Sequence, residues 1–124
     1  MFAVLAEVSL DSADPEALIR FYQRVLGGEV SVVSADFVVL RLAGISVTSS
    51  RVAGYRPPTW PQNTVPKQVH LDLRVMSLSL DEVEVECLAA GARLADDQPY
   101  PDQYRVFFDP AGHPFCACLP ADWA

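Results

Sequence analysis

Residues suited to chemistry are few in this sequence and lie far apart along the chain. Only two histidines, His70 and His113, and three cysteines occur among 124 residues. Within the segment VPKQVHLDLRV, residues 65–75, apolar residues alternate with His70, Asp72 and Arg74 from Val69 onward. This alternation is typical of a half-buried strand. An imidazole on its polar face can bind a metal, contact a substrate, or only hydrogen-bond a neighbour.

Cysteines form a second pattern near the end of the chain. Cys116 and Cys118 are two residues apart, so both side chains lie on one face of a strand,. Two thiols placed in this way can bind a soft metal ion. Buried cysteine is also an ordinary small apolar residue, and we expect packing for this pair and for Cys87. His113 directly follows Asp109-Pro110-Ala111-Gly112 and is expected at a turn.

Aromatic residues supply the third candidate, because Tyr55 and Trp60 lie in the proline-rich run GYRPPTWP. Prolines hold such a segment extended at low entropic cost. Large aromatic side chains in a connector either close an edge of the fold or form the wall of a ligand cleft, and both interpretations stay open. The sequence has no Gly-rich phosphate loop, nucleophile elbow or Ser-His-Asp arrangement. We therefore assign no catalytic residue.

Composition and charge exclude several classes of partner. A net charge of −7 and a pI of about 4.6 would repel nucleic acid,. No apolar run approaches the roughly 20 residues that span a bilayer, and the N-terminal segment lacks the basic start of a signal peptide. An odd number of cysteines without framework spacing favours reduced thiols. We expect a cytoplasmic protein that binds neither nucleic acid nor membrane.

The elements that position these residues are expected in two similar halves. In the first half, residues 2–10 predict a strand. Asp14-Pro15-Glu16 predicts a helix start, with an N-cap, a proline at the first helical position and an acid in the first turn. Leu18, Phe21, Tyr22 and Val25 form one apolar helical stripe,. Gly27 ends this helix, and strands are expected at 29–34, 37–42 and 45–52.

The second half repeats this order. It predicts a strand at 69–75, whose apolar residues Val69, Leu71, Leu73 and Val75 should be buried under a helix. A helix at 80–90 ends at Gly91, and strands follow at 92–95, 105–109 and 114–119. Gly27 and Gly91 lie 64 positions apart, and Glu7 and His70 lie 63 apart. A period of this size indicates two copies of one supersecondary unit.

We therefore expect an α+β fold of two βαβββ modules in a single domain spanning residues 1–124. The first module should span about 1–52 and the second about 68–124, with a connector at 53–67.

This organisation resembles the vicinal oxygen chelate superfamily, which includes glyoxalase I, bleomycin-resistance proteins and extradiol dioxygenases. The run VSLDSADPEALIRFYQRVLGG is similar to the opening strand and helix of that superfamily. The run FFDPAGHPFCACLP is similar to its Asp-Pro-x-Gly turn and closing strand. GYRPPTWP, with VHLDLRV after it, is similar to a glyoxalase-like subgroup whose activity is mostly unassigned.

The resemblance also implies where a metal would be held. Metal-using members place one ligand on the first strand and one on the last strand of each module. The matching positions in this chain are Glu7, His70, Thr48 (or Ser50) and Cys116. The family typically has His, Gln or Glu at all four. Glu7 and His70 fit, Cys116 is a soft ligand and Thr48 is a poor one, so a divalent metal ion would be held weakly.

Three functions follow from the resemblance. The one we expect is the binding of a small molecule in a concave cleft with a degenerate metal site, lined by Glu7, Tyr55, Trp60, His70 and Cys116. The second is a metal-dependent lyase, isomerase or dioxygenase of the glyoxalase type, with Glu7 and His70 as metal ligands. The third is a structural or regulatory module that forms a homodimer.

Overall fold

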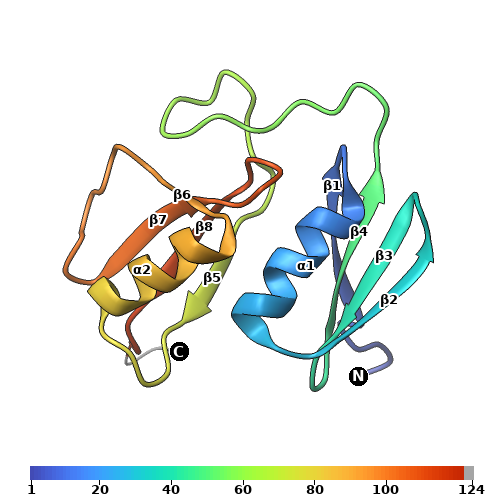
Figure 1. The fold of residues 1–124 in the computed structure, drawn as a ribbon, viewed down its shortest axis with the longest axis horizontal. Helices are drawn as coiled ribbons and strands as arrows, with labels where there is room; N and C mark the ends of the chain where they lie inside the picture. Colours follow the sequence, from blue (N-terminus) through green and yellow to red (C-terminus); the bar gives the residue numbers. More distant parts are fainter. Residues whose placement is uncertain (122–124) are drawn as a thin grey trace. The chain divides into compact units, whose positions relative to one another are not determined.

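The chain forms two units, each built from one four-stranded sheet and one helix (Figure 1). They are seen in a computed structural model that describes residues 1–121, and they meet in sequence between Tyr55 and Arg56, inside the expected connector. Strand order is β1-β4-β3-β2 in the first sheet and β5-β8-β7-β6 in the second. In both sheets the first strand is parallel to the last. The predicted α+β fold of two βαβββ modules is thereby confirmed.

The first unit contains β1 (Glu7–Ser12), α1 (Pro15–Leu26), β2 (Glu29–Ser34), β3 (Phe37–Arg41) and β4 (Ser46–Arg51). Helix α1 begins where its cap predicts, because the Ala17 N–H donates to Asp14 Oδ1 at 3.1 Å,. Leu18 and Tyr22 of α1 are fully buried, as are Val38 and Leu40 of β3. Helix α1 thus covers one face of this sheet (Figure 1).

The start of the chain differs from the prediction of a strand at 2–10. Strand β1 begins only at Glu7 and continues to Ser12, and the apolar residues before it are exposed by at least 70%: Met1, Phe2, Val4 and Leu5. In the part of the chain that the structure describes, β1 pairs only with β4, and this pairing begins with Ser46 opposite Glu7. Alternation alone therefore does not produce a strand where no neighbouring strand is present to pair with.

The second unit contains β5 (Leu71–Arg74), α2 (Leu80–Ala90), β6 (Arg93–Leu94), β7 (Tyr104–Phe108) and β8 (Pro114–Cys118). Ser79 is the N-cap of α2, and it exchanges two hydrogen bonds with Glu82, three residues later,. The Glu82 N–H donates to Ser79 Oγ at 3.1 Å, and the Ser79 hydroxyl donates to Glu82 Oε1 at 3.2 Å. Gly91 ends α2 in the left-handed conformation,. No helix among residues 1–121 is long and apolar enough to cross a bilayer.

The predicted burial of the apolar face of 69–75 is wrong at Val69, which is 64% exposed. Leu71 and Leu73 are half-buried, and only Val75 lies in the core. Among residues 1–121, strand β5 is an edge strand and pairs only with β8. Within the described residues, α2 contacts β6, β7 and β8 but not β5. The apolar face of β5 therefore lacks the helix that would bury it.

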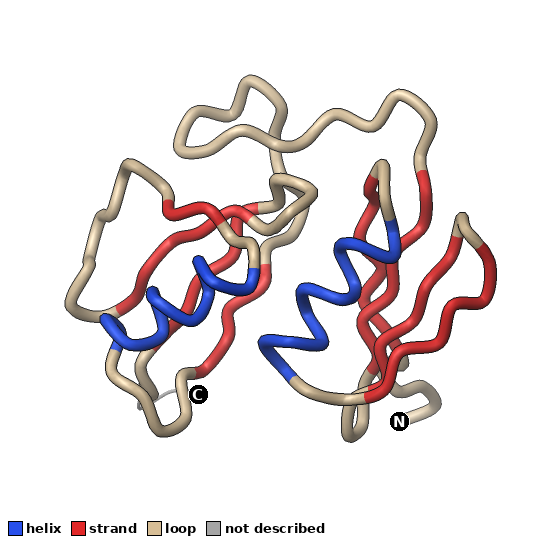
Figure 2. The backbone as a smooth tube through the Cα atoms, in the orientation of Figure 1, coloured by secondary structure: helices blue, strands red, loops and turns tan. Residues whose placement is uncertain are grey.

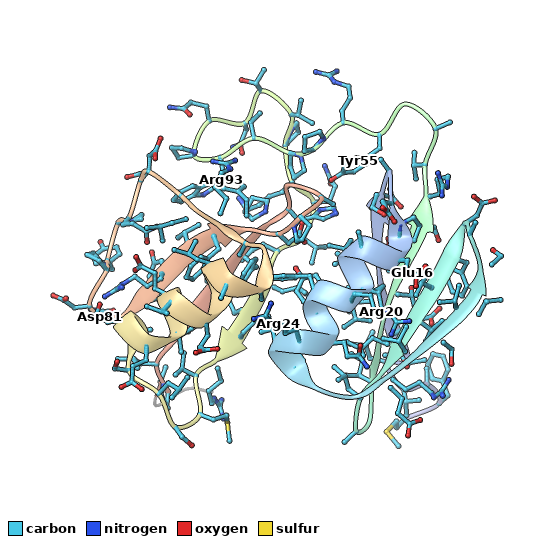
Figure 3. All side chains as sticks on the ribbon, in the orientation of Figure 1. Glu16, Arg20, Arg24, Tyr55, Asp81 and Arg93 are labelled. Carbon is cyan, nitrogen blue, oxygen red and sulfur yellow. The ribbon has the colours of Figure 1, made fainter. Side chains whose placement is uncertain are left out.

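An arginine near the start of β7 links α2 to its sheet. Arg105 Nη1 donates to Glu84 Oε2 at 2.6 Å, and Nη2 donates to Asp81 Oδ1 at 2.9 Å. Asp81 lies at the start of α2 (Figure 3). The Arg105 side chain is only 14% exposed, and the hydrogen bond to Asp81 is the main cause that raises its pKa. Helix α2 buries only Leu80 and Cys87 fully, so this ionic link supplements a small apolar contact.

Candidate functional site

The second unit has a cleft of about 650 Å³ on the face of its sheet opposite α2. Along β8, Cys116 and Cys118 face the cleft while Phe115 and Ala117 are buried on the other side. The residues that line the cleft come from β5, β7, β8 and the segments next to them: Trp60, Lys67, His70, Asp72, Gln103, Tyr104, Val106, Pro114, Cys116, Cys118, Leu119, Pro120 and Ala121. Period-two alternation along the strands explains why the odd and even residues of β8 separate in this way.

The floor of the cleft is apolar. Ala95, Val106 and Phe108 form a buried cluster, and the partly buried Trp60, Tyr104 and Cys116 pack against it. The Arg93 guanidinium carbon lies 4.3 Å from the centre of the Phe108 ring, a cation–π distance,. The members of this cluster that line the cleft, Trp60, Tyr104, Val106 and Cys116, give an apolar group a surface to pack against.

Trp60 is held in place by a closed loop in the connector, which has neither helix nor strand (Figure 2). The Thr59 N–H donates to the Val65 carbonyl at 2.8 Å, and the Val65 N–H donates to Thr59 Oγ1 at 3.0 Å. The Thr59 hydroxyl also donates to the Gln62 carbonyl at 2.6 Å. These three bonds close residues 59–65 into one turn, and Trp60, which lies within this turn, forms a wall of the cleft.

The connector also contacts the turn before β8. Gly112 has a φ of +86°, and a Cβ at this position would lie 2.7 Å from Pro57 Cβ. Only glycine allows both this backbone conformation and this approach. The same turn is closed by the Asp109 carboxylate, which accepts from the Ala111 and His113 N–H groups at 2.9 Å and 3.0 Å. His113 thus lies at a turn, as predicted.

Three side chains with metal-binding atoms meet at the rim of the cleft, and we call His70, Asp72 and Cys116 the polar corner. Asp72 lies directly opposite Cys116 in the parallel pairing of β5 and β8. His70 Nε2 lies 3.2 Å from Asp72 Oδ1, and one ligand atom from each of the three residues lies within 4.8 Å of the others. The side chains of His70 and Asp72 are 41% and 53% exposed, while Cys116 is half-buried.

The thiols in the cleft are protonated at neutral pH. Burial first, and the negative charge of Asp72 second, raise the pKa of the Cys116 thiol to about 12. The same two causes, in the same order, raise the pKa of the Cys118 thiol, and burial is the main cause that raises the Tyr104 pKa. All three cysteines are free thiols. A cation beside Cys116 would favour its thiolate and lower this pKa.

The sequence-predicted site residues are divided between the two units. His70, Cys116 and Trp60 line the same cleft in the second unit. Glu7 and Tyr55 lie in the first unit, Glu7 exposed on β1 and Tyr55 half-buried at a turn after β4. Their roles in ligand or metal binding stay predictions.

Asp72 was not among the predicted site residues. The sequence could have identified it, because the alternation that places His70 on the polar face of the strand also places Asp72 there.

Register gives each member of the polar corner a counterpart in the first unit. Thr48 lies opposite Ser9 in the pairing of β1 and β4, as Cys116 lies opposite Asp72. Glu7 precedes Ser9 by two residues, as His70 precedes Asp72. Thr48 is fully buried, and its Oγ1 has no hydrogen-bond partner among the described residues. The counterpart set therefore consists of one carboxylate and two hydroxyls.

Comparison with known proteins agrees with this fold. A family model described as a glyoxalase-like domain matches residues 7–118. A fosfomycin resistance protein of Listeria monocytogenes shares 17% identity at a TM-score of 0.72, over 99% of this chain and 98% of that chain. A glyoxalase/bleomycin resistance protein/dioxygenase family enzyme of Burkholderia phytofirmans PsJN shares 20% identity at a TM-score of 0.69, over 94% and 98%. A glyoxalase-related enzyme of Fulvimarina pelagi shares 20% identity at 0.67, over 97% and 89%. The sequence has no match among curated proteins.

Proposed function

This chain belongs to the glyoxalase-like domain family of the vicinal oxygen chelate superfamily, and we propose that it binds a small organic molecule in the cleft of its second unit. One observation carries the proposal, namely an apolar floor and wall that end in the polar corner. Small-molecule sites are concave and mostly apolar, with a few polar groups that orient the ligand. The cleft volume of about 650 Å³ lies within the usual range for such sites.

The arrangement of the lining residues suits a ligand with an apolar part and a polar part. Its apolar body would pack between Trp60 and Tyr104, above Val106. Its polar group would face the polar corner, where the His70 imidazole donates and the Asp72 carboxylate accepts. Lys67 and Gln103 line the cleft as well and add one cation and one amide. A compact aromatic or unsaturated molecule with an oxygen-bearing end matches this division.

A thermal-shift screen of the full chain against a small-molecule panel, with chelator present, tests the proposal. Compounds that raise the melting temperature are expected to lose at least about tenfold in affinity with Trp60→Ala, because removal of a central aromatic anchor costs about 2 kcal/mol or more. Phe2→Ala is the matched control, since Phe2 is an exposed aromatic residue that does not line the cleft. Hits that bind Trp60→Ala as tightly as the parent chain would contradict the proposal.

A second candidate function is metal-dependent catalysis by a lyase, isomerase or dioxygenase, and the polar corner favours it. A structure of a single-residue mutant of the Listeria monocytogenes fosfomycin resistance protein is a complex with Mn(II) and 1S,2S-dihydroxypropylphosphonic acid. Manganese prefers oxygen-rich sites, whereas a thiol, an imidazole and a carboxylate suit zinc or a similar ion. When bound, such an ion would polarise a carbonyl or hydroxyl oxygen of the substrate. The Trp60 wall and the apolar floor would position that oxygen and exclude water from it.

Metal analysis separates the two candidates. The protein is purified without chelator or affinity tag, and its bound metal is measured by elemental analysis. The catalytic candidate requires about one ion per chain, lost with His70→Ala, together with turnover of a cleft ligand that stops when the ion is removed. A metal-free protein that still binds cleft ligands supports the binding function alone.

A further inference from the structure

We propose that the polar corner is a metal site complete within the second unit and selective for thiophilic divalent ions such as Zn²⁺, Co²⁺ and Cd²⁺ over Mn²⁺ and Mg²⁺. Its protein ligands are His70, Asp72 and Cys116. The inference deepens the proposed function, because it rests on the cleft being a ligand site and names the ion at its rim.

The backbone brings the three donors together. Strands β5 and β8 are parallel neighbours, and their register sets Asp72 directly opposite Cys116. Neighbouring strands lie about 4.8 Å apart, so two side chains at opposed positions reach a common point. His70 precedes Asp72 by two residues and projects to the same side. Two strand segments of one unit therefore supply all three ligands.

The distances between donor atoms suit a small tetrahedral ion. Two nitrogen or oxygen ligands at about 2.0–2.1 Å from a tetrahedral ion lie about 3.3 Å apart. His70 Nε2 and Asp72 Oδ1 are 3.2 Å apart. The third ligand atom, on Cys116, lies within 4.8 Å of both, and rotation about the cysteine Cα–Cβ bond can shorten these separations. The fourth position of the tetrahedron would face the cleft, where a ligand oxygen or water can bind.

The chemistry of the donors selects the ion. Thiolate is a soft ligand and imidazole a borderline one, and both favour Zn²⁺, Co²⁺ and Cd²⁺. Mn²⁺ and Mg²⁺ prefer octahedral sites made of carboxylates, carbonyls and water, and the polar corner offers them a single carboxylate. Cation binding would also displace the thiol proton of Cys116, which makes binding stronger as the pH rises.

The first unit does not duplicate this donor set. Its counterpart positions hold Glu7, Ser9 and Thr48, and neutral hydroxyls are weak ligands for these ions. The two modules of the repeat have therefore diverged, and only the second has three metal-binding side chains at these positions. This divergence separates the present proposal from a site in which Glu7 is a ligand.

Cobalt titration of the chelator-treated full chain tests the proposal. Co²⁺ is expected to give a thiolate-to-metal charge-transfer band in the near ultraviolet and visible bands of tetrahedral intensity. Zn²⁺ should abolish both spectra, and an equal concentration of Mn²⁺ should leave them unchanged. The charge-transfer band should disappear with Cys116→Ser. It should persist with Cys118→Ser, the matched control, because Cys118 has the same residue type and lines the same cleft on the same strand face.

Variants of the other ligands complete the experiment, and circular dichroism confirms that each is folded. His70→Ala and Asp72→Asn should each weaken Co²⁺ binding at least about tenfold, as expected for the loss of a ligand. Glu7→Gln should leave the affinity unchanged. A Glu7→Gln variant weakened as much as His70→Ala, a Co²⁺ spectrum without a thiolate band, or Mn²⁺ that competes as well as Zn²⁺ would overturn the inference.

Failure of this inference and failure of the proposed function give different results. The small-molecule screen is carried out with chelator present, so it measures ligand binding to the cleft in the absence of a metal ion. If compounds bind in a Trp60-dependent way but Co²⁺ gives no spectrum, the metal site is rejected and the small-molecule function stands. If Co²⁺ gives the thiolate band but no compound binds in a Trp60-dependent way, the metal site stands and the small-molecule function is rejected.

Discussion

Asp72 and Cys116 occupy directly opposed positions on two parallel strands, and this places a carboxylate beside a half-buried thiol. Burial and then the charge of Asp72 raise the Cys116 pKa to about 12 from an ordinary value of 9.0. A thiol with a raised pKa is protonated over a wider pH range, so its nucleophilic thiolate is scarce below pH 9.

We predict that Asp72→Asn accelerates alkylation of Cys116 by iodoacetamide in the presence of chelator. Loss of the negative charge stabilises the thiolate and lowers the pKa, and each unit of pKa changes the thiolate fraction about tenfold at pH 8. Burial remains, so the pKa stays above 9.0. Mass spectrometry of the modified peptide against time gives the rate. Alkylation no faster in Asp72→Asn would show that the carboxylate does not act on the thiol.

His70→Ala should change the free energy of unfolding by no more than about 0.5 kcal/mol, because His70 lies at an exposed rim,. Leu40→Ala should cost about 2–5 kcal/mol, since Leu40 is fully buried,. Leu71→Ala should lie between them at about 1–2 kcal/mol, because Leu71 is only half-buried on an edge strand,. Urea unfolding followed by circular dichroism orders the three variants. A cost for His70→Ala above that of Leu71→Ala would place His70 in the core.

Arg105→Ala is expected to destabilise the second unit by about 1.5–3 kcal/mol, because it leaves the partly buried Glu84 carboxylate without its charged donor,. Arg41→Ala is the matched control. Its ion pair with Glu29 is exposed on both sides, and such pairs contribute about 0–1 kcal/mol. Urea unfolding at low and high salt measures both variants. Equal costs for the two variants would show that Arg105 does not hold α2 against the sheet.

Gly112→Ala should destabilise the protein more than Gly44→Ala. The two glycines have similar φ values, +86° and +83°, so both substitutions introduce the left-handed strain of about 1–2 kcal/mol,. At Gly44 the added methyl group meets no atom within 4 Å, whereas at Gly112 it would lie 2.7 Å from Pro57 Cβ. The connector must then move, and Trp60 with it. A change in near-ultraviolet circular dichroism in Gly112→Ala but not in Gly44→Ala is the expected signature.

The repeat of secondary structure is readable from the sequence because its signals are local. Asp14 caps α1 and Gly91 ends α2 through side-chain and backbone properties of a few adjacent residues,. The 64-residue spacing of Gly27 and Gly91 then marks the two modules. Local alternation also places His70 and Asp72 on one strand face, so the amino-acid sequence alone brings together two members of the polar corner.

The tertiary structure decided those features that depend on contacts between residues distant in sequence. Strand β1 begins at Glu7 because pairing with β4 begins there, and Val69 is exposed because α2 does not cover β5. The approach of Cys116 to Asp72 depends on the register of two strands separated by α2, β6 and β7. A one-residue shift in that register would turn Cys116 to the buried face. Alternation along each strand is set by the chain itself, but the register between strands is set by packing, and that register assembled the candidate site.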